Sequence, residues 1–390
     1  MPLKILHIVI DEIFIDDTIE LCHDICAVNK FVTFTQEYPY KYIHRYPSEI
    51  KSILKTELIP LLLNEDFQMV AFHTLDSSLY ELVLQIPPQI KVLWLAWGYD
   101  LYCITPPIIN LPLLKPKTRC FVNNGVEQLS LEKRIKRWVK GIYYYPQQRK
   151  IQLKHKKNDN QIKTIQNNVL SRIDYMSVVL PSEYDVLAQN PFFHAQYFPW
   201  QYCDKSSNSF LYNPFHITDC ADMILLGNSA TETNNHIDVY RLLRKRGIYN
   251  TCVIPLSYGD AYYQSLLQTY FCENESVQLL TEFMSLEQYE QILHQCKIAV
   301  FGHIRQQAIG NIIRCMAQGT KVYFYKDSMA YKYLIKEGYV VYSIENDLTF
   351  NHIATPLSDE DWKKNIDKLR KWFSYDCVVK RINNMIENEF

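Results

Sequence analysis

Short apolar runs recur along this chain, and segments with helical spacing of apolar residues separate them. The runs are continuous rather than alternating, which is typical of strands buried on both faces of a parallel sheet. In the helical segments, Ser285 and Gln288 predict a capping box at one helix start. The predicted strands cover residues 4–10, 30–34, 67–73, 91–97, 174–180, 222–227, 250–256, 297–302 and 321–326. Strands that alternate with helices predict α/β domains with right-handed crossovers.

A polar stretch at residues 202–222 interrupts this alternation and predicts a linker between domains. A chain of 390 residues is long enough for two such domains. We therefore expect one domain over 1–205 and a second over 206–390. The charged, helical segment 359–390 either closes the second domain or crosses back to the first.

The net charge of −1 is unevenly distributed. Eleven Lys and Arg residues fall between positions 131 and 163, where only Glu132 and Asp159 oppose them. Apolar residues from Leu131, including Trp138, follow helical spacing. The segment predicts a basic helix that binds an anionic membrane surface, although a solvated surface helix has the same pattern. No recognisable RNA- or DNA-binding module accompanies it, so we expect no nucleic-acid partner.

The eleven cysteines are scattered and contain no C-x-x-C pair, as expected for reduced thiols in a cytoplasmic protein. The N-terminal stretch lacks the pattern of a signal peptide. No run approaches eighteen apolar residues, so we expect no ordinary transmembrane helix.

Ligands of open α/β sheets bind beyond the carboxyl ends of the strands. After the strand at 222–227, Gly227, Asn228 and Ser229 lead to a predicted helix start at Asn234 and His236. Glycine permits close backbone approach, and free N–H groups at a helix start favour anions. The same residues also suit an ordinary turn and cap, so both interpretations remain open.

A second candidate loop follows the strand at 297–302. Arg305 and the amides Gln306 and Gln307 precede Gly310 and Asn311, which open an apolar helix. A guanidinium and backbone N–H groups together can hold a diphosphate. The glycine spacings of a P-loop or a dinucleotide fingerprint are missing.

Two further places carry candidate chemistry. Trp97 and Gly98, followed by Asp100, combine an aromatic surface with a carboxylate, as sugar-binding sites do. His73 and Asp11 lie at or just past predicted strand ends, where either could act as a general base toward a hydroxyl group. Each of these residues also suits a core or capping role. We find no cluster with metal-ligand spacing and no G-x-S-x-G or H-E-x-x-H motif.

Taken in order, four motifs make the chain resemble a known enzyme family. They are W-x-x-W-G-x-D-L-Y at 94–102, G-N-S-x(4)-N-x-H at 227–236, V-I-P-L-x-Y at 253–258 and R-Q-Q-x-I-G-N at 305–311. Their order and spacing resemble bacterial TDP-4-acetamido-4,6-dideoxygalactose:lipid II transferases of enterobacterial common antigen synthesis. The resemblance is weak over the first 60 residues and firmest from about 222 to 326.

The resemblance implies a GT-B fold, in which two Rossmann-like domains face each other across a central cleft. It implies a peripheral glycosyltransferase at the cytoplasmic membrane face, which moves a sugar from TDP to a lipid-linked saccharide with inversion. It requires no metal and no cofactor, because Arg305 and helix N-termini would stabilise the leaving diphosphate. By position, the cleft would be lined by Gly227, Asn228, Ser229, Asn234, His236, Tyr258, Arg305, Gln306, Gln307, Gly310 and Asn311, and from the first domain by Trp97, Gly98, Asp100 and His73. The catalytic base would be His73 or Asp11, with Asp100 behind them.

Two departures from the family pattern concern the substrates. The family tends to carry glycine where this chain has Ala308, and the basic stretch around 130–165 is longer than expected. Two other functions remain open: a nucleotide-sugar epimerase-like GT-B enzyme and a non-catalytic nucleotide-sugar binding or scaffold protein. The sequence does not identify the sugar, the accepting hydroxyl group or the oligomeric state.

Overall fold

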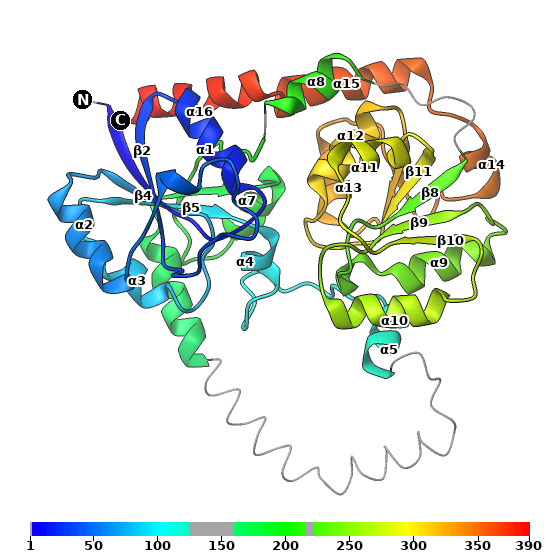
Figure 1. Cartoon of the computed structure of the whole chain (residues 1–390), viewed down its shortest axis with the longest axis horizontal. Coiled ribbons are helices and arrows are strands. Elements are labelled where there is room, and N and C mark those ends of the chain that lie inside the picture. Colours follow the sequence, from blue (N-terminus) through cyan, green and yellow to red (C-terminus); the bar gives the residue numbers. More distant parts are fainter. Residues whose placement is uncertain (1, 125–159, 204, 215–221) are drawn as a thin grey trace, which may run out of the picture. The chain divides into compact units, whose positions relative to one another are not determined.

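A computed structural model describes residues 2–124, 160–203, 205–214 and 222–390 of the chain. The chain divides into two compact units, each built around a parallel sheet (Figure 1). The first unit takes its described residues from Met1–Asn110, His155–Tyr212 and Arg370–Phe390, and the second from Leu111–Lys154 and Asn213–Leu369.

In the described part of the first unit, seven parallel strands pair in the order β3-β2-β1-β4-β5-β6-β7. Their bounds are β1 Leu3–Ile8, β2 Ala27–Thr33, β3 Ile50–Ser52, β4 Met69–Phe72, β5 Lys91–Ala96, β6 Tyr175–Val178 and β7 Gln196–Tyr197. The helices are α1 Ile15–Asp24, α2 Leu58–Asn64, α3 Tyr80–Gln85, α4 Gly98–Tyr102, α7 Pro181–Leu187, α8 Ser206–Tyr212 and α16 Tyr375–Glu389, with 3₁₀ turns at Pro47–Glu49 and Lys55–Glu57. Residues 160–172 are also helical.

The second sheet has the order β10-β9-β8-β11-β12-β13 over the residues that the structure describes. Its strands are β8 Met223–Leu226, β9 Cys252–Pro255, β10 Val277–Leu280, β11 Cys296–Phe301, β12 Lys321–Phe324 and β13 Tyr342–Ser343. The surrounding helices are α5 Pro116–Asn124, α9 His236–Lys245, α10 Ala261–Phe271, α11 Leu286–Leu293, α12 Ile309–Ala317, α13 Met329–Lys336, α14 Phe350–Ala354 and α15 Asp359–Phe373, with a 3₁₀ turn, η3, at Glu232–Asn234. Helices α9 and α10 cover one face of this sheet, and α11, α12 and α13 cover the other (Figure 1).

Burial on both faces explains the continuous apolar runs. The central strands β1, β4 and β5 are buried almost throughout, as are β8 and β11 in the second unit. All nine predicted strands form, as does the capping box of Ser285 and Gln288 at the start of α11. Strands β3, β7, β10 and β13 were not predicted, because they are short or partly exposed and so lack a long apolar run.

The two units differ in two places from the expected division at residues 205 and 206. The segment from Leu111 to α5 belongs to the second unit, because Phe121 packs in the core of that unit and α5 lies against α9. At the other end, α16 packs on the first sheet, where Val378 and Ile382 are fully buried. The last helical segment could close the second unit or cross back to the first, and α16 belongs to the first unit.

The predicted basic segment lies largely outside the described residues, which resume only at residue 160. Among the described helices, none has both the length and the apolar character needed to cross a bilayer. The described part of the chain likewise holds no group of three or more His, Cys, Asp or Glu side chains that could bind a metal ion.

Candidate active site

In each sheet, successive strands are first added toward one edge and then toward the other, and we call the position where this changes the reversal point. In the second unit this point lies between β8 and β11, whose connections leave toward opposite edges of the sheet. The loops after these two strands therefore separate and leave a crevice at the carboxyl ends, which is the usual ligand site of such sheets. The loop after β8 carries Gly227 to His236, and the loop after β11 carries Gly302 to Asn311. These are the two loops that the sequence singled out.

Gly227 adopts φ +71°, a left-handed conformation that favours glycine. A Cβ atom at this position would stand 2.7 Å from Nε2 of His236 and 3.1 Å from Oδ1 of Asn234. Both side chains are fully buried beneath the loop. Asn234 donates to the carbonyl of Ser229 at 2.9 Å, and Nδ1 of His236 pairs with the Tyr263 hydroxyl at 3.1 Å. Gly227 is therefore required for steric reasons, and Asn234 and His236 shape the loop from below.

Burial also fixes the charge state of His236. It lowers the pKa of this histidine to about 3, so the ring is neutral at physiological pH. The oxygen of Asn234 and Nε2 of His236 have no hydrogen-bond partner among the described residues. A neutral, buried ring cannot supply positive charge to a diphosphate, which leaves that task to other groups.

Side chains connect the two loops directly. Gln307 donates to Oδ1 of Asn228 at 2.9 Å and accepts from the hydroxyl of Thr233 at 2.6 Å. Gln307 is itself buried, so these bonds are protected from water. The structure thus brings together one residue from each of the two motifs that sequence reasoning had paired only by resemblance.

Asn235 anchors the start of α9 from the same place. It adopts φ +53°, and its amide group donates to the carbonyls of Gly302 at 2.8 Å and Leu113 at 3.0 Å. Its side-chain oxygen accepts from the backbone N–H of Lys115 at 2.7 Å. The role of Asn235 could not be predicted from the sequence, because its partners lie up to 122 positions away.

The loop after β11 carries positive charge near a helix start. Arg305 is half-buried and donates to the carbonyl of Gln306 at 2.8 Å. His303 pairs through Nδ1 with the carbonyl of Arg305 at 3.0 Å, and burial lowers the pKa of this histidine to about 3. Because a carbonyl only accepts, Nδ1 of the neutral His303 carries the proton and supports the loop from below. Sequence reasoning missed His303.

Helix α12 begins at Ile309, four residues after this arginine. Its N-cap residue is Ala308 at φ +62°, and no side chain caps the helix. Helix α9 also begins without a side-chain cap, at Asn235. The exposed Gly310 and the half-buried Asn311 occupy the first turn of α12. Two uncapped helix starts with Arg305 beside one of them make this edge of the sheet suitable for anions.

Tyr258 and Ser229 complete the described candidates of the second unit. Tyr258 is 47% exposed and follows β9. Its carbonyl accepts from the N–H of Ala230 at 2.7 Å, which holds the loop after β8 against the loop after β9. Ser229 is buried, and its hydroxyl pairs with that of Thr231 at 2.9 Å.

In the first unit the order reverses between β1 and β4, and the candidate residues gather at that edge. Asp100 is fully buried and ties the loops after β4 and β5 together. One oxygen accepts from the Thr74 hydroxyl at 2.8 Å, and the other from the indole N–H of Trp94 at 3.1 Å. That second oxygen also accepts from the backbone N–H groups of Leu75 and Trp97, both at 3.3 Å. This geometry favours a structural role, with the buried Gly98 starting α4 beside it.

Asp11 is likewise occupied by backbone donors. Its carboxylate accepts from the N–H groups of Lys41 at 2.5 Å, Tyr42 at 2.9 Å and Ile43 at 3.2 Å. The neighbouring Glu12 is half-buried after β1, and burial raises its pKa. A carboxylate with a raised pKa at the reversal point suits proton abstraction, so sequence reasoning missed a candidate one position away from its own choice.

His73 is fully buried at the end of β4 and does not reach the surface. Its Nε2 lies 2.9 Å from Nδ1 of His7, and its Nδ1 lies 3.1 Å from the Tyr202 hydroxyl. Burial lowers the pKa of His7 to about 4 and that of His73 well below its usual value. Any influence of His73 on a substrate therefore passes through Tyr202.

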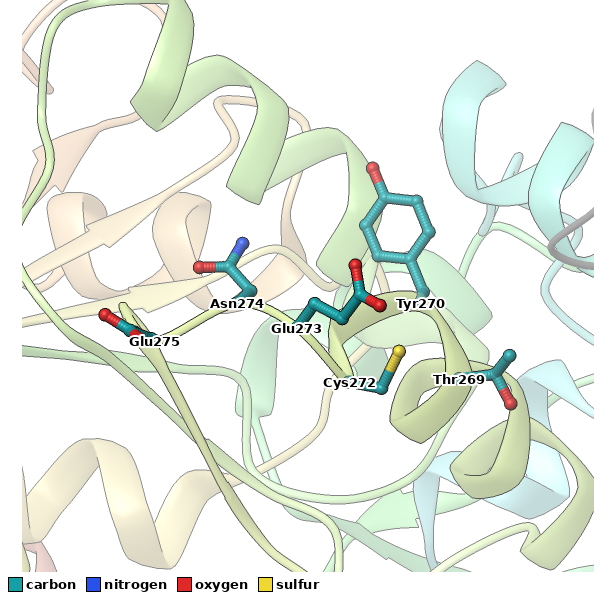
Figure 2. A pocket seen from close by; sticks show the side chains of 6 residues that line it. All are labelled: Thr269, Tyr270, Cys272, Glu273, Asn274 and Glu275. Carbon is teal, nitrogen blue, oxygen red and sulfur yellow. The ribbon is translucent and has the colours of Figure 1, made fainter.

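A shallow pocket lies away from these edges. Figure 2 shows its lining by Thr269, Tyr270, Cys272, Glu273, Asn274 and Glu275, between the end of α10 and the start of β10. This is the amino end of β10, whereas the candidate loops lie at the carboxyl ends of their strands. The pocket is not part of the candidate site.

Comparison with known proteins agrees with this geometry. Residues 189–367, just under half of the chain, match the family described as 4-alpha-L-fucosyltransferase, glycosyl transferase group 56. The match spans both loops of the second reversal point.

Solved structures of similar fold extend over the whole chain. Sucrose-phosphate synthase from Thermosynechococcus elongatus is 10% identical with a TM-score of 0.59, over 99% of this chain and 98% of that one. HepE of Anabaena, in complex with UDP and glucose, is 10% identical with a TM-score of 0.58, over 99% of both chains. The lipopolysaccharide outer core galactosyltransferase WaaB is 10% identical with a TM-score of 0.56, over the full length of both chains. At this identity the likeness concerns the fold.

The fold is GT-B, with two Rossmann-like units, and the family match assigns the chemistry to sugar transfer. The protein is a glycosyltransferase of the GT-B type.

Proposed function

We propose that this enzyme transfers a 6-deoxyhexose from a nucleoside diphosphate to a lipid-linked saccharide in the assembly of a surface polysaccharide. The central support is the edge of the second sheet, which carries the uncapped starts of α9 and α12, with Arg305 in the loop that leads into α12. Such an arrangement suits a diphosphate, which carries the negative charge that both features favour.

Two resemblances support the class of sugar. The family that matches residues 189–367 is described as a fucosyltransferase, and fucose is a 6-deoxyhexose. The motif order resembles transferases of 4-acetamido-4,6-dideoxygalactose, which also lacks the 6-hydroxyl group. A TDP-linked acetamido-dideoxy sugar is the donor that we favour.

In this mechanism the second unit binds the donor, and the first unit binds the acceptor. Arg305 and the two helix starts stabilise the charge that develops on the departing diphosphate. A base removes the proton from the acceptor hydroxyl group, which attacks the anomeric carbon with inversion. Of the carboxylates at the first reversal point, Glu12 is better suited than Asp11, whose oxygens already accept three N–H groups.

A lipid-linked acceptor requires the enzyme to work at a membrane. We propose that the basic segment 131–163 supplies the contact with anionic lipids at the cytoplasmic face, because it contains eleven Lys and Arg residues and only two acidic residues. Binding to vesicles with and without phosphatidylglycerol tests this step, and equal binding to both would contradict it.

A transfer assay tests the proposal as a whole. The purified chain is incubated with TDP-4-acetamido-4,6-dideoxygalactose, GDP-fucose or UDP-glucose and a panel of undecaprenyl-diphosphate-linked saccharides. We expect release of TDP together with an acceptor whose mass has increased by one sugar. Epimerised donor without transfer, or unchanged donor and acceptor, would contradict the proposal.

A further inference from the structure

A chain of buried hydrogen bonds runs through the first unit, and its direction can be determined from one amide. Asn29 donates through Nδ2 to the carbonyl oxygens of Cys22 at 2.9 Å and Ala27 at 3.2 Å. Carbonyl oxygens only accept, so these bonds fix the orientation of the amide group. Its Oδ1 must then accept from Nε2 of His7, which lies 3.0 Å away.

The next two bonds follow from charge neutrality. A neutral imidazole carries one N–H, so His7 with a proton on Nε2 accepts at Nδ1. His73 therefore donates from Nε2 to His7 across 2.9 Å and accepts at its own Nδ1. The group 3.1 Å from that nitrogen is the hydroxyl of Tyr202, which must donate inward. The phenolic oxygen of Tyr202 is left with lone pairs that can only accept.

The Trp97 indole packs against the Tyr202 ring. The rings of Trp97 and Tyr202 are 5.7 Å apart. Burial raises the pKa of the Tyr202 hydroxyl, and an interaction with the Trp97 indole N–H opposes this rise. The indole N–H nevertheless forms no hydrogen bond of normal geometry to any residue that the structure describes. The buried indole N–H thus interacts with the Tyr202 oxygen without forming a hydrogen bond of normal geometry, beside an acceptor of fixed direction.

The surroundings of this pair are aromatic and partly open. Phe14, in the loop after β1, lies 6.0 Å from the rings of both Trp97 and Tyr202 and is 44% exposed. Tyr99, on α4, is also exposed. Phe14 contacts both rings, and its exposed ring offers an apolar surface of the kind on which sugar rings stack.

We propose that Trp97 and Tyr202 form a subsite for one hydroxyl group of the acceptor saccharide, with the indole N–H donating to that hydroxyl and the Tyr202 oxygen accepting from it. A hydroxyl group both donates and accepts, so it complements the pair. His73 and His7 are positioning residues that fix the direction of the Tyr202 hydroxyl. The inference rests on the proposed function, since it takes the diphosphate to bind in the second unit.

Steady-state kinetics of Tyr202→Phe test the subsite. The probe is the undecaprenyl-diphosphate-linked saccharide that wild-type enzyme uses best. We expect the acceptor KM to rise about tenfold or more, with the donor KM unchanged and kcat within threefold, since a lost hydrogen bond in a polar site is worth that much. Tyr184→Phe is the matched control, because its hydroxyl donates to the carbonyl of Ala195 at 2.7 Å, away from this edge.

Deoxy analogues of the same acceptor identify the hydroxyl group. One analogue should lose affinity for wild-type enzyme by the factor that Tyr202→Phe causes, and should lose nothing further in the variant. An unchanged acceptor KM in Tyr202→Phe, with wild-type transfer intact, would overturn the subsite alone. Absence of wild-type transfer and of nucleotide binding would overturn the proposed function, and the subsite with it.

The direction of the chain has its own test. Nitrogen NMR of the full chain labelled in histidine should show His7 and His73 neutral at pH 7, each with its proton on Nε2. The resonances are assigned by their loss in His73→Asn and His7→Asn. A proton on Nδ1 of His73 would contradict the fixed polarity of Tyr202.

Discussion

A Cβ atom on Gly302 would stand 2.4 Å from the carbonyl oxygen of Asn234. Gly302 lies in the loop after β11, and Asn234 lies in the loop after β8. The backbones of these two loops, on either side of the second reversal point, therefore pack closely at Gly302. Gly302 does not need a left-handed conformation, and its requirement is purely steric. The candidate site of the second unit therefore depends on close packing of the loop after β8 against the loop after β11.

We predict that Gly302→Ala lowers the free energy of unfolding by about 1 to 3 kcal/mol, because a methyl group must displace the backbone at Asn234. Nucleotide affinity should fall as well, because the displaced residue Asn234 lies two positions before His236, where α9 begins. Gly310→Ala is the control, because its Cβ would meet nothing within 4 Å. Thermal unfolding measures the stability of both variants, and equal melting temperatures for Gly302→Ala and Gly310→Ala would show that the loops are not closely packed at Gly302.

Ala308 gives a second prediction. Its φ of +62° costs an alanine about 1 kcal/mol, whereas glycine adopts this conformation freely. Ala308→Gly should therefore leave stability unchanged or raise it by up to about 1 kcal/mol, and Ala308→Val should lower it by more than about 1 kcal/mol. Chemical denaturation measures both changes. A stabilising valine would show that the loop is not left-handed in solution.

The third prediction concerns pH. Burial raises the pKa of Asp100 to about 6, above its value in the unfolded chain, so the native protein binds more protons between about pH 4 and 6. The contribution of Asp100 to stability is therefore largest at low pH and falls as pH rises through this window. Asp100→Asn should remove that fall, which denaturation at pH 4, 5, 6 and 7 would detect.

The same variant tests the catalytic assignment of Asp100. An asparagine can accept the three N–H groups with its oxygen and donate to Thr74, so we expect transfer to persist. A loss of kcat by a hundredfold or more in a folded Asp100→Asn protein would restore Asp100 as a catalytic residue.

Glu12→Gln supplies the fourth prediction. If Glu12 is the base, kcat should fall about 10²- to 10⁴-fold while the donor KM stays constant. Asp11→Asn should act mainly on stability, because it weakens the bonds to the loop at 41–43. Kinetics and melting temperatures of both variants distinguish the two roles. A full kcat in Glu12→Gln would remove Glu12 as the base.

The sequence predicts the central strands well, because β1, β4, β5, β8 and β11 are buried on both faces and read as continuous apolar runs. It also locates both loops of the second reversal point, since Gly227 directly follows β8 and Arg305 lies four residues after the end of β11. The long-range contacts could not be predicted from the sequence. Nothing local to Asn235 indicates that it binds Leu113, and nothing local to α16 indicates that it returns to the first unit.

The first unit shows a further limit of sequence reasoning. His73 and Asp100 were singled out for their chemistry, but both are fully buried, which residue type alone does not reveal. Tyr202 had no signal at all, because the chain contains 29 tyrosines and its partner His73 lies 129 positions away.

In the proposed mechanism, the edge of the second sheet binds a nucleoside diphosphate through Arg305. Calorimetric titration of the purified chain with TDP, UDP and GDP, without added metal, measures this binding. We predict selective binding of TDP, weakened at least tenfold by Arg305→Ala, because a charge-assisted hydrogen bond to phosphate is worth about 1.5 to 3 kcal/mol. Arg241→Ala is the matched control and should leave the affinity unchanged, because this guanidinium group donates to the Tyr270 hydroxyl at 3.2 Å. Binding of none of the three nucleotides, or equal affinity in Arg305→Ala, would contradict the account.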